Sequence, residues 1–268
     1  MFFPKLGHQQ LTMIPFFRKI RYQLAEENQF LKYSRYAIGE IVLVVIGILI
    51  ALYINNWNEL RIEKQKEQAL LLGLQETFAN NLENLNFVLS DTRIAFESSK
   101  RVLDLLGTEH SGYSDAELDT LLGHMINYTT YDPSTGTIDN IINSGTLNII
   151  QNKELKDNIS NWSGMLNDAE KDIEIANNHA FNILLPYLND KVNLKNLPVP
   201  RSITERTGLN ISRASHFPVN YATVMGDKEF ENLVDFHAVN FIYLSREYIE
   251  LKEYLEHNLA LIAKEIEN

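Results

Sequence analysis

A continuous apolar run near the N-terminus constrains this chain more than any other feature. From Ile41 to Ile54 every residue is apolar or Tyr, and extending the run back to Ala37 adds one charge, Glu40. These 18 residues form about 27 Å of helix, close to the roughly 30 Å hydrocarbon core of a bilayer. Aromatic residues that anchor a span at both interfaces flank it: Tyr33, Tyr36, Tyr53 and Trp57. We therefore predict a transmembrane helix over residues 36–54.

Two other structures share part of this pattern, a buried core helix and a cleavable signal peptide. A core helix is expected to carry a polar stripe, and this run has none. A signal peptide needs a short leading segment and small residues at its cleavage site. Here about 35 residues precede the run, and Leu49 lies two residues before Ala51. We therefore expect an uncleaved signal anchor.

The charges on the two sides of the span predict its orientation. Residues 1–35 hold six Lys or Arg and two Glu, a net charge of +4, whereas residues 55–67 hold three of each sign. Because positively charged flanks stay in the cytoplasm, we predict a cytoplasmic N-terminus and residues 55–268 outside. The residues that carry this prediction of membrane position and topology are Arg18, Lys19, Arg21, Arg35, Glu40, Tyr53 and Trp57.

The predicted cytoplasmic arm, residues 1–35, contains a basic amphipathic segment. Within residues 13–35, apolar side chains recur at helical spacing opposite three basic residues. Such a helix is expected to lie on an anionic membrane leaflet. Glu40 follows one turn inside the span, where an acid either marks a functional site or reaches the interface beside Arg35. We favour the second interpretation.

Three long apolar stripes with spacings of three and four residues predict an all-α exterior. The first continues from the span to Gly107, the second begins at Asn152 and ends near Pro186, and the third begins at Asp227. The expected fold is an antiparallel helical bundle with long, coiled-coil-like helices. Pairing of the stripes between chains, in a homo-oligomer, stays open as an addition.

Shorter features lie between these stripes. Ser114 and Glu117 form a capping-box signature for a short helix. Residues 189–226 hold three Pro and two Gly without a sustained period, which predicts a long loop across one end of the helical body. The apolar residues expected to dock this loop on the body are Leu194, Leu197, Val199, Ile203, Phe217, Val219 and Tyr221.

Composition and motifs exclude several classes of site. The 268 residues contain no Cys, which excludes disulfides, thiolate zinc sites and a cysteine nucleophile. The formal net charge of −11 argues against a nucleic-acid partner. None of the seven His has a metal-binding spacing, and no P-loop, G-x-S-x-G or G-x-G-x-x-G motif occurs. We therefore expect no cofactor, no metal and no enzyme activity.

Two of the histidines have structural interpretations. His237 falls on the apolar stripe of the last helix, where we predict a core histidine rather than a ligand. Glu253 and His257 are four residues apart, which is typical of a surface pair on a helix.

Two polar turns between predicted helices are the candidate sites for a ligand or a partner. Their residues are Asp132, Ser134, Gly136, Ser144 and Gly145. Turn formation alone accounts for this composition. We favour that structural role and keep binding as the alternative.

Several segments resemble a known family. FFRKIR (16–21), ENQFLKY (27–33) and YAIGEIVLVVIGILIALYINNWNE (36–59) resemble the opening of uncharacterised single-pass membrane proteins of Gram-negative bacteria, which contain a domain of unknown function. DPSTG (132–136) and NSGTLNIIQNKEL (143–155) are similar to the second recurrent region of that family. The resemblance implies a membrane location, and the predicted orientation in a Gram-negative cell then gives a cytoplasmic (inner) membrane protein with residues 55–268 in the periplasm. It supplies no activity or substrate.

The leading hypothesis is a non-enzymatic, membrane-anchored helical protein that presents an interaction module in the periplasm. Besides the lipid bilayer, its partner would be a protein or a second copy of the chain. The alternative is a ligand-sensing ectodomain that signals through a partner protein, because about 35 cytoplasmic residues are too few for an output domain. An envelope hydrolase ranks third. Residues 55–268 hold 18 Lys or Arg and 32 Asp or Glu, a balance that favours cationic ligands or basic partners.

Overall fold

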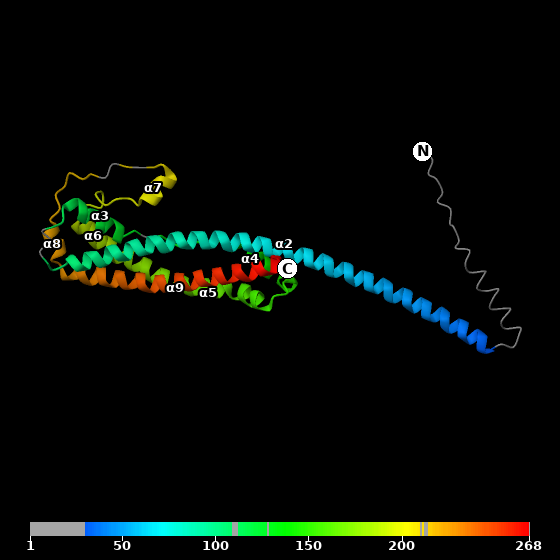
Figure 1. The fold of residues 1–268 in the computed structure, drawn as a ribbon. Coiled ribbons are helices and arrows are strands. Elements are labelled where there is room, and N and C mark those ends of the chain that lie inside the picture. The colour runs from blue at the N-terminus through cyan, green and yellow to red at the C-terminus, as the bar shows by residue number, and fades with distance from the viewer. Residues whose placement is uncertain (1–29, 109–111, 128, 210, 212–213, 268) are drawn as a thin grey trace, which may run out of the picture. The chain divides into compact units, whose positions relative to one another are not determined.

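The computed structural model describes residues 30–108, 112–127, 129–209, 211 and 214–267 (Figure 1). These residues form helices and connecting segments with no strand among them, so the predicted all-α class is confirmed for this part of the chain. Most of the predicted cytoplasmic arm, with Arg18, Lys19 and Arg21, lies outside the described residues. The chain divides into two compact units, Met1–Gln65 and Lys66–Asn268.

Helix α2 (Phe30–Leu105) contains the predicted span. Every side chain between Ile41 and Ile54 is exposed, and a window of 18 residues with a mean hydropathy of 2.7 has none of its residues buried. Within the described ranges, one helix is long and apolar enough to cross a membrane. The exposure contradicts the core-helix alternative, because a core helix is covered by its own protein.

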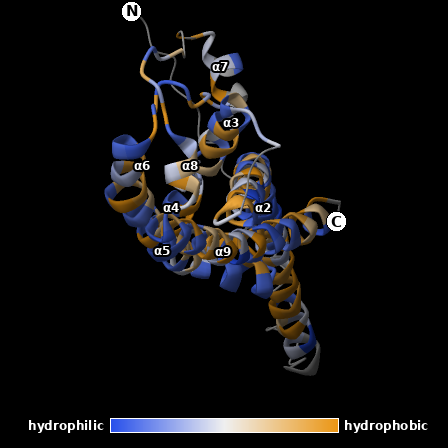
Figure 2. Ribbon diagram, turned by 90° about the vertical axis from the view of Figure 1, so that its left-hand side faces the viewer, coloured by the Kyte–Doolittle hydropathy of each residue, from blue (hydrophilic) through white to orange (hydrophobic). Residues whose placement is uncertain are grey.

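Among the described residues, three long helices and several short ones make up the second unit (Figure 1). The long ones are α2 after Gln65, α5 (Lys153–His179) and α9 (Lys228–Glu267). The short ones are α3 (Asp115–Met125), α4 (Gly136–Asn143), the 3₁₀ helix η1 (Thr146–Ile149), the π-helix η2 (Ala180–Leu184), α6 (Leu185–Lys191), α7 (Arg201–Thr207) and α8 (Tyr221–Met225). The long helices carry both hydrophilic and hydrophobic residues (Figure 2), as amphipathic stripes predict.

Helix α9 runs antiparallel to both other long helices. Gln68, near the start of this part of α2, donates from Nε2 to the carbonyl oxygen of Glu265 at the end of α9 (2.9 Å). His179, at the end of α5, has its Nε2 2.9 Å from the carbonyl oxygen of Leu233 near the start of α9. These contacts leave α2 and α5 parallel to each other.

The predicted stripes meet in one core along the three long helices. The ring of the buried Trp162 of α5 lies 5.8 Å from Phe78 of α2, edge to face, and 5.7 Å from Tyr254 of α9, stacked. Such ring pairs contribute roughly 1 kcal/mol each beyond burial. Other buried members include Leu71, Leu74, Leu85, Val88, Ala95, Leu155, Ile159, Ala169, Ala176, Phe241, Leu244, Tyr248, Leu251, Leu255, Leu261 and Ile262.

A second core forms where α2 ends. Its buried residues are Val102, Leu106, Leu118, Leu122, Met125, Leu184, Leu188, Val192, Leu197, Tyr221, Val224, Met225, Phe230 and Val234. The predicted loop docks here through both of its ends, near Leu197 and Tyr221, and contains the short helices α7 and α8. Ile203 and Phe217 were also expected to dock, but they are 42% and 79% exposed. Instead of docking there, this part of the loop is held by a hydrogen bond between two of the loop's own residues: Asn193 Nδ2 donates to the carbonyl oxygen of Phe217 (2.6 Å).

The loop also makes a close approach to α3. A Cβ atom at Gly123 would lie 2.4 Å from Cδ of Pro198. Glycine is therefore required at this position if the loop is to reach the second core.

Three predicted helix starts are confirmed, one of them at Asp227, directly before α9, and one predicted end is wrong. Ser114 and Glu117 form the capping box of α3, and Asn152 Oδ1 accepts from the backbone N–H of Leu155 (3.0 Å) at the start of α5. Helical backbone continues past Pro186 to Lys191. Proline is tolerated there because it lies in the first turn of α6, where its missing N–H costs little.

Candidate functional site

The first predicted polar turn is tied to α2 by hydrogen bonds. Asn81 accepts at Oδ1 from the backbone N–H of Ser134 (2.8 Å) and donates from Nδ2 to the Ser134 carbonyl oxygen (2.9 Å). The Asp132 carboxylate accepts from Thr130 Oγ1 (2.9 Å). Gly136 is the first residue of α4. The backbone N–H and C=O of Ser134 are therefore both satisfied by the Asn81 side chain.

The second predicted turn lies at the other end of α4. Gly145 has a φ of 74°, in the left-handed region that favours glycine. The hydroxyl groups of Ser144 and Thr146 are 2.8 Å apart. The structure thus separates Ser144 and Gly145 from Asp132 and Ser134 by the length of α4. Ligand or partner binding at either turn stays a prediction.

Further polar contacts hold the segment that contains both turns against α2. Thr77 Oγ1 donates to Thr137 Oγ1 (2.9 Å), and Thr129 Oγ1 donates to Asp91 Oδ2 (2.8 Å). Together with Asn81, these bonds give α2 a row of polar anchors. These contacts give the turns a structural role, in agreement with the interpretation that their amino-acid composition favoured.

Two buried histidines lie together where α5 meets α9. His237 is 1% exposed, which confirms the predicted core histidine. Its Nε2 is 3.0 Å from the carbonyl oxygen of Met125, and its Nδ1 has no hydrogen-bond partner among the described residues. The rings of His237 and His179 are 5.7 Å apart. Burial lowers the pKa of His237 to about 4, so the ring is neutral at physiological pH.

Two other polar contacts were not visible in the sequence. The Tyr221 hydroxyl donates to the buried Asp119 carboxylate, and burial raises the pKa of Asp119. His257 lies 2.7 Å from Glu154 Oε1 of α5. The pair expected within one helix, with Glu253, is thus replaced by a pair between helices. Among the described residues, no three His, Cys, Asp or Glu are placed to hold a metal ion.

The residues predicted to set the membrane position fall on the first unit, where the structure describes them. Arg35, Glu40 and Tyr53 all lie on α2 and are exposed. The Arg61 guanidinium lies 5.7 Å from the centre of the Trp57 ring, within the range of a cation–π contact.

A groove of about 540 Å³ lies on the surface of the second unit. It follows the outer face of α2, with one apolar residue of α3 beside it. Its described lining residues are Ser90, Arg93, Ile94, Glu97, Ser98, Lys100, Arg101, Asp104 and Leu121. The volume falls in the range of small-molecule sites.

One cation of this groove is held in position. Arg101 donates from Nε to the hydroxyl of Tyr113 (3.0 Å), and its guanidinium lies 5.9 Å from the centre of that ring. Among the described residues, no hydrogen bond or ion pair involves the terminal nitrogens of this guanidinium. Sequence reasoning did not single out the groove, because its residues belong to a helix that was assigned only a packing stripe.

A signal for the groove is nevertheless present in the sequence. Between Lys66 and Lys153 the chain contains 12 Asp or Glu and only three Lys or Arg. Those three cations are Arg93, Lys100 and Arg101, and all of them line the groove.

One family model matches part of the chain, and that family has no known function. Comparison with curated proteins finds no significant match, and comparison with solved structures finds none. Residues 40–167, which include both polar turns and the groove, match the model of DUF6090, a family of unknown function.

Proposed function

We propose that this chain is a single-pass protein of the cytoplasmic (inner) membrane, anchored by residues 36–54. Its N-terminus would lie in the cytoplasm and residues 55–268 in the periplasm. There the helices of the second unit would act as an antiparallel bundle that binds a protein partner. The role is non-enzymatic in this proposal, and the match to a family of unknown function is compatible with it.

The observation that carries the anchor is the exposure of the apolar run on all sides of α2. No side chain between Ile41 and Ile54 is covered by the protein. With about 1.5 kcal/mol for each large apolar side chain moved out of water, the run favours the membrane by on the order of 20 kcal/mol. A single acid in a span costs roughly 3 kcal/mol, so Glu40 does not outweigh this gain.

A reporter fused after Asn268 tests the orientation. An enzyme that is active only outside the cytoplasm is expected to be active there, and a cytoplasm-only reporter is expected to be silent. The matched control replaces Arg18, Lys19 and Arg21 with Glu, which removes the charge asymmetry and should reduce the outside signal. Activity of the cytoplasm-only reporter on the parent chain would refute the topology.

The interaction role is supported by what the second unit leaves exposed. Its core uses most of the predicted stripes within one chain, yet α9 keeps Phe236, Ile242, Tyr243 and Ile249 about half exposed. Large apolar and aromatic side chains of this kind are enriched at protein interfaces. Crosslinking in intact cells, followed by identification of the captured proteins, tests this role. If crosslinking captured neither another protein nor a second copy of this chain, the interaction role would be refuted.

The second candidate is a ligand sensor, and the groove on α2 favours it. A ligand bound to the folded state raises the melting temperature by mass action. A metabolite screen against the purified full chain, read out as melting temperature, therefore discriminates a sensor from a scaffold. No stabilising compound in the screen would count against the sensor.

A further inference from the structure

We propose that the groove on α2 binds a small organic oxyanion that also carries hydrogen-bond donors, such as an amino- or hydroxycarboxylate. The proposal gives the sensor candidate its ligand class and rests on that candidate only for the biological role. It also differs from the cationic ligands that the overall charge favours, because the local charge of the groove is opposite to that of its surroundings.

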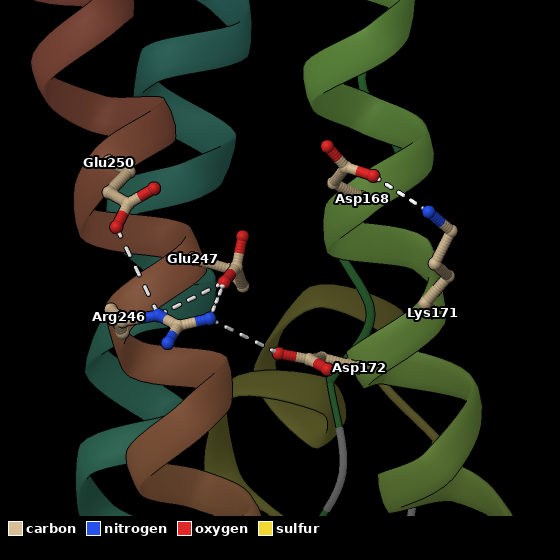
Figure 3. Close-up of polar contacts among 6 residues, drawn as sticks. All are labelled: Asp168, Lys171, Asp172, Arg246, Glu247 and Glu250. Carbon is tan, nitrogen blue, oxygen red and sulfur yellow. Dashed lines mark hydrogen bonds and ion pairs between the residues drawn. The ribbon is translucent and has the colours of Figure 1, made fainter.

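Some cations elsewhere on the second unit have carboxylate partners, whereas Lys153, Lys156, Lys195 and Lys228 have none among the described residues. Lys171 Nζ lies 2.7 Å from Asp168 on the same helix (Figure 3). Arg246 lies among Asp172, Glu247 and Glu250, with contacts that join α9 to α5 (Figure 3).

Two cations of the groove also lack a partner, and they lie close together on one helix. Arg93 and Lys100 have no hydrogen-bond or ion-pair partner in the part of the chain that the structure describes. Glu97 lies four residues after Arg93 and three before Lys100 on the same helix. Helical ion pairs form at these spacings, yet among the described residues Glu97 pairs with neither cation. Two cations seven residues apart, about 10.5 Å along the helix axis, are therefore open to a ligand.

A hydroxyl group supplies a further unused donor. Thr92 and Ser99 donate to the carbonyl oxygens four residues before them, each at 2.8 Å. Ser98 lies between them on α2, is 7% exposed and lines the groove. Its hydroxyl makes no such bond within the described residues. A ligand oxygen in the groove would satisfy it.

The remaining lining residues restrict the ligand. Ile94 and Leu121 give the groove apolar surface, which favours an organic molecule over a bare inorganic ion. Glu97 and Asp104 would repel a pure anion but accept hydrogen bonds from an ammonium or hydroxyl group. The combination selects a molecule that has an oxyanion for the cations and a donor for the carboxylates.

Calorimetric titration of the full chain in detergent micelles tests the proposal with three probes: glutamate, succinate and inorganic phosphate. We expect saturable binding that is tightest for glutamate, which alone combines carboxylates with an ammonium donor. Arg93→Gln and Lys100→Gln are each expected to weaken binding about tenfold, since each removes a charge-assisted contact. Lys171→Gln, the matched loss of a surface cation, should leave binding unchanged.

Two results would overturn the proposal. The first is no saturable binding of any probe at about 10 mM, or equal binding by the parent and the groove variants. The second is binding of phosphate as tight as that of glutamate, which would describe an unselective anion patch. All substituted side chains are exposed, so we expect the variants to fold like the parent chain. The reporter after Asn268 measures topology separately, and failure of either test leaves the other standing.

Discussion

Lowering the pH from 7 to 5 is expected to destabilise the second unit by about 2 kcal/mol through His237 alone. Its pKa is about 4 in the folded protein, against an ordinary value of 6.5. Between these values the unfolded chain binds a proton that the folded chain does not, so the free energy of unfolding falls as the pH falls. At about 1.36 kcal/mol per pH unit, the interval from 6.5 down to 5 gives this magnitude.

The structure explains why protonation of His237 is unfavourable. The ring is 1% exposed, and its Nδ1 has no acceptor among the described residues, so a second N–H would be buried without a partner. The neighbouring His179 ring, 5.7 Å away, would repel a charged imidazole once it is itself protonated. Burial also lowers the pKa of His179.

Urea unfolding of the full chain in detergent micelles measures the effect. The chain has two Trp, so a Trp57→Phe background leaves the buried Trp162 as the only tryptophan reporter of the second unit. His237→Gln keeps a donor for the Met125 carbonyl oxygen and removes the titration. The difference in unfolding free energy between parent and variant should change by about 2 kcal/mol in favour of the variant between pH 7 and pH 5. A difference that stays constant over this interval would refute the reasoning.

Three substitutions test the packing with the same unfolding measurement. Gly123→Ala should cost about 1–3 kcal/mol, since its Cβ would lie 2.4 Å from Pro198; an unchanged midpoint would contradict the close approach. Gly164→Ala is the matched control, because nothing lies within 4 Å of its Cβ, and it should gain about 0.5–1 kcal/mol. Asn81→Ala removes two hydrogen bonds to Ser134 and should cost about 1–3 kcal/mol, with faster hydrogen exchange at the Ser134 amide. Slow exchange there would show that the turn does not depend on α2.

Local signals in the sequence predicted most of the helices. The apolar run, the stripes around Phe78 and Trp162 and the caps at Ser114 and Asn152 act within a few residues of one another, so their outcome can be derived from spacing. The helical stop expected at Pro186 was wrong because the same residue type is harmless in the first turn of a helix.

Features that depend on contacts between distant residues could not be predicted in this way. The docking of the loop through Leu197, the pairing of His179 with His237 and the groove beside Leu121 each join segments far apart in the sequence. Spacing predicts which face of a helix is apolar, but it does not predict which helix covers that face. For the same reason, exposed Phe217 was expected to be docked.

The π-helix η2 keeps the side chains that follow it facing the same core as those that precede it. Ala176, Ala180, Leu184 and Leu188 are all buried, at successive steps of four residues. In a regular α-helix each such step drifts by about 40°, so three steps would turn the last side chain roughly 120° away from the core. The wider turn at Ala180–Leu184 absorbs this drift. The extra residue of this turn thus determines which face of α6 is turned toward the core. Deleting one residue there would rotate α6 about its axis and turn Leu188 away from the core.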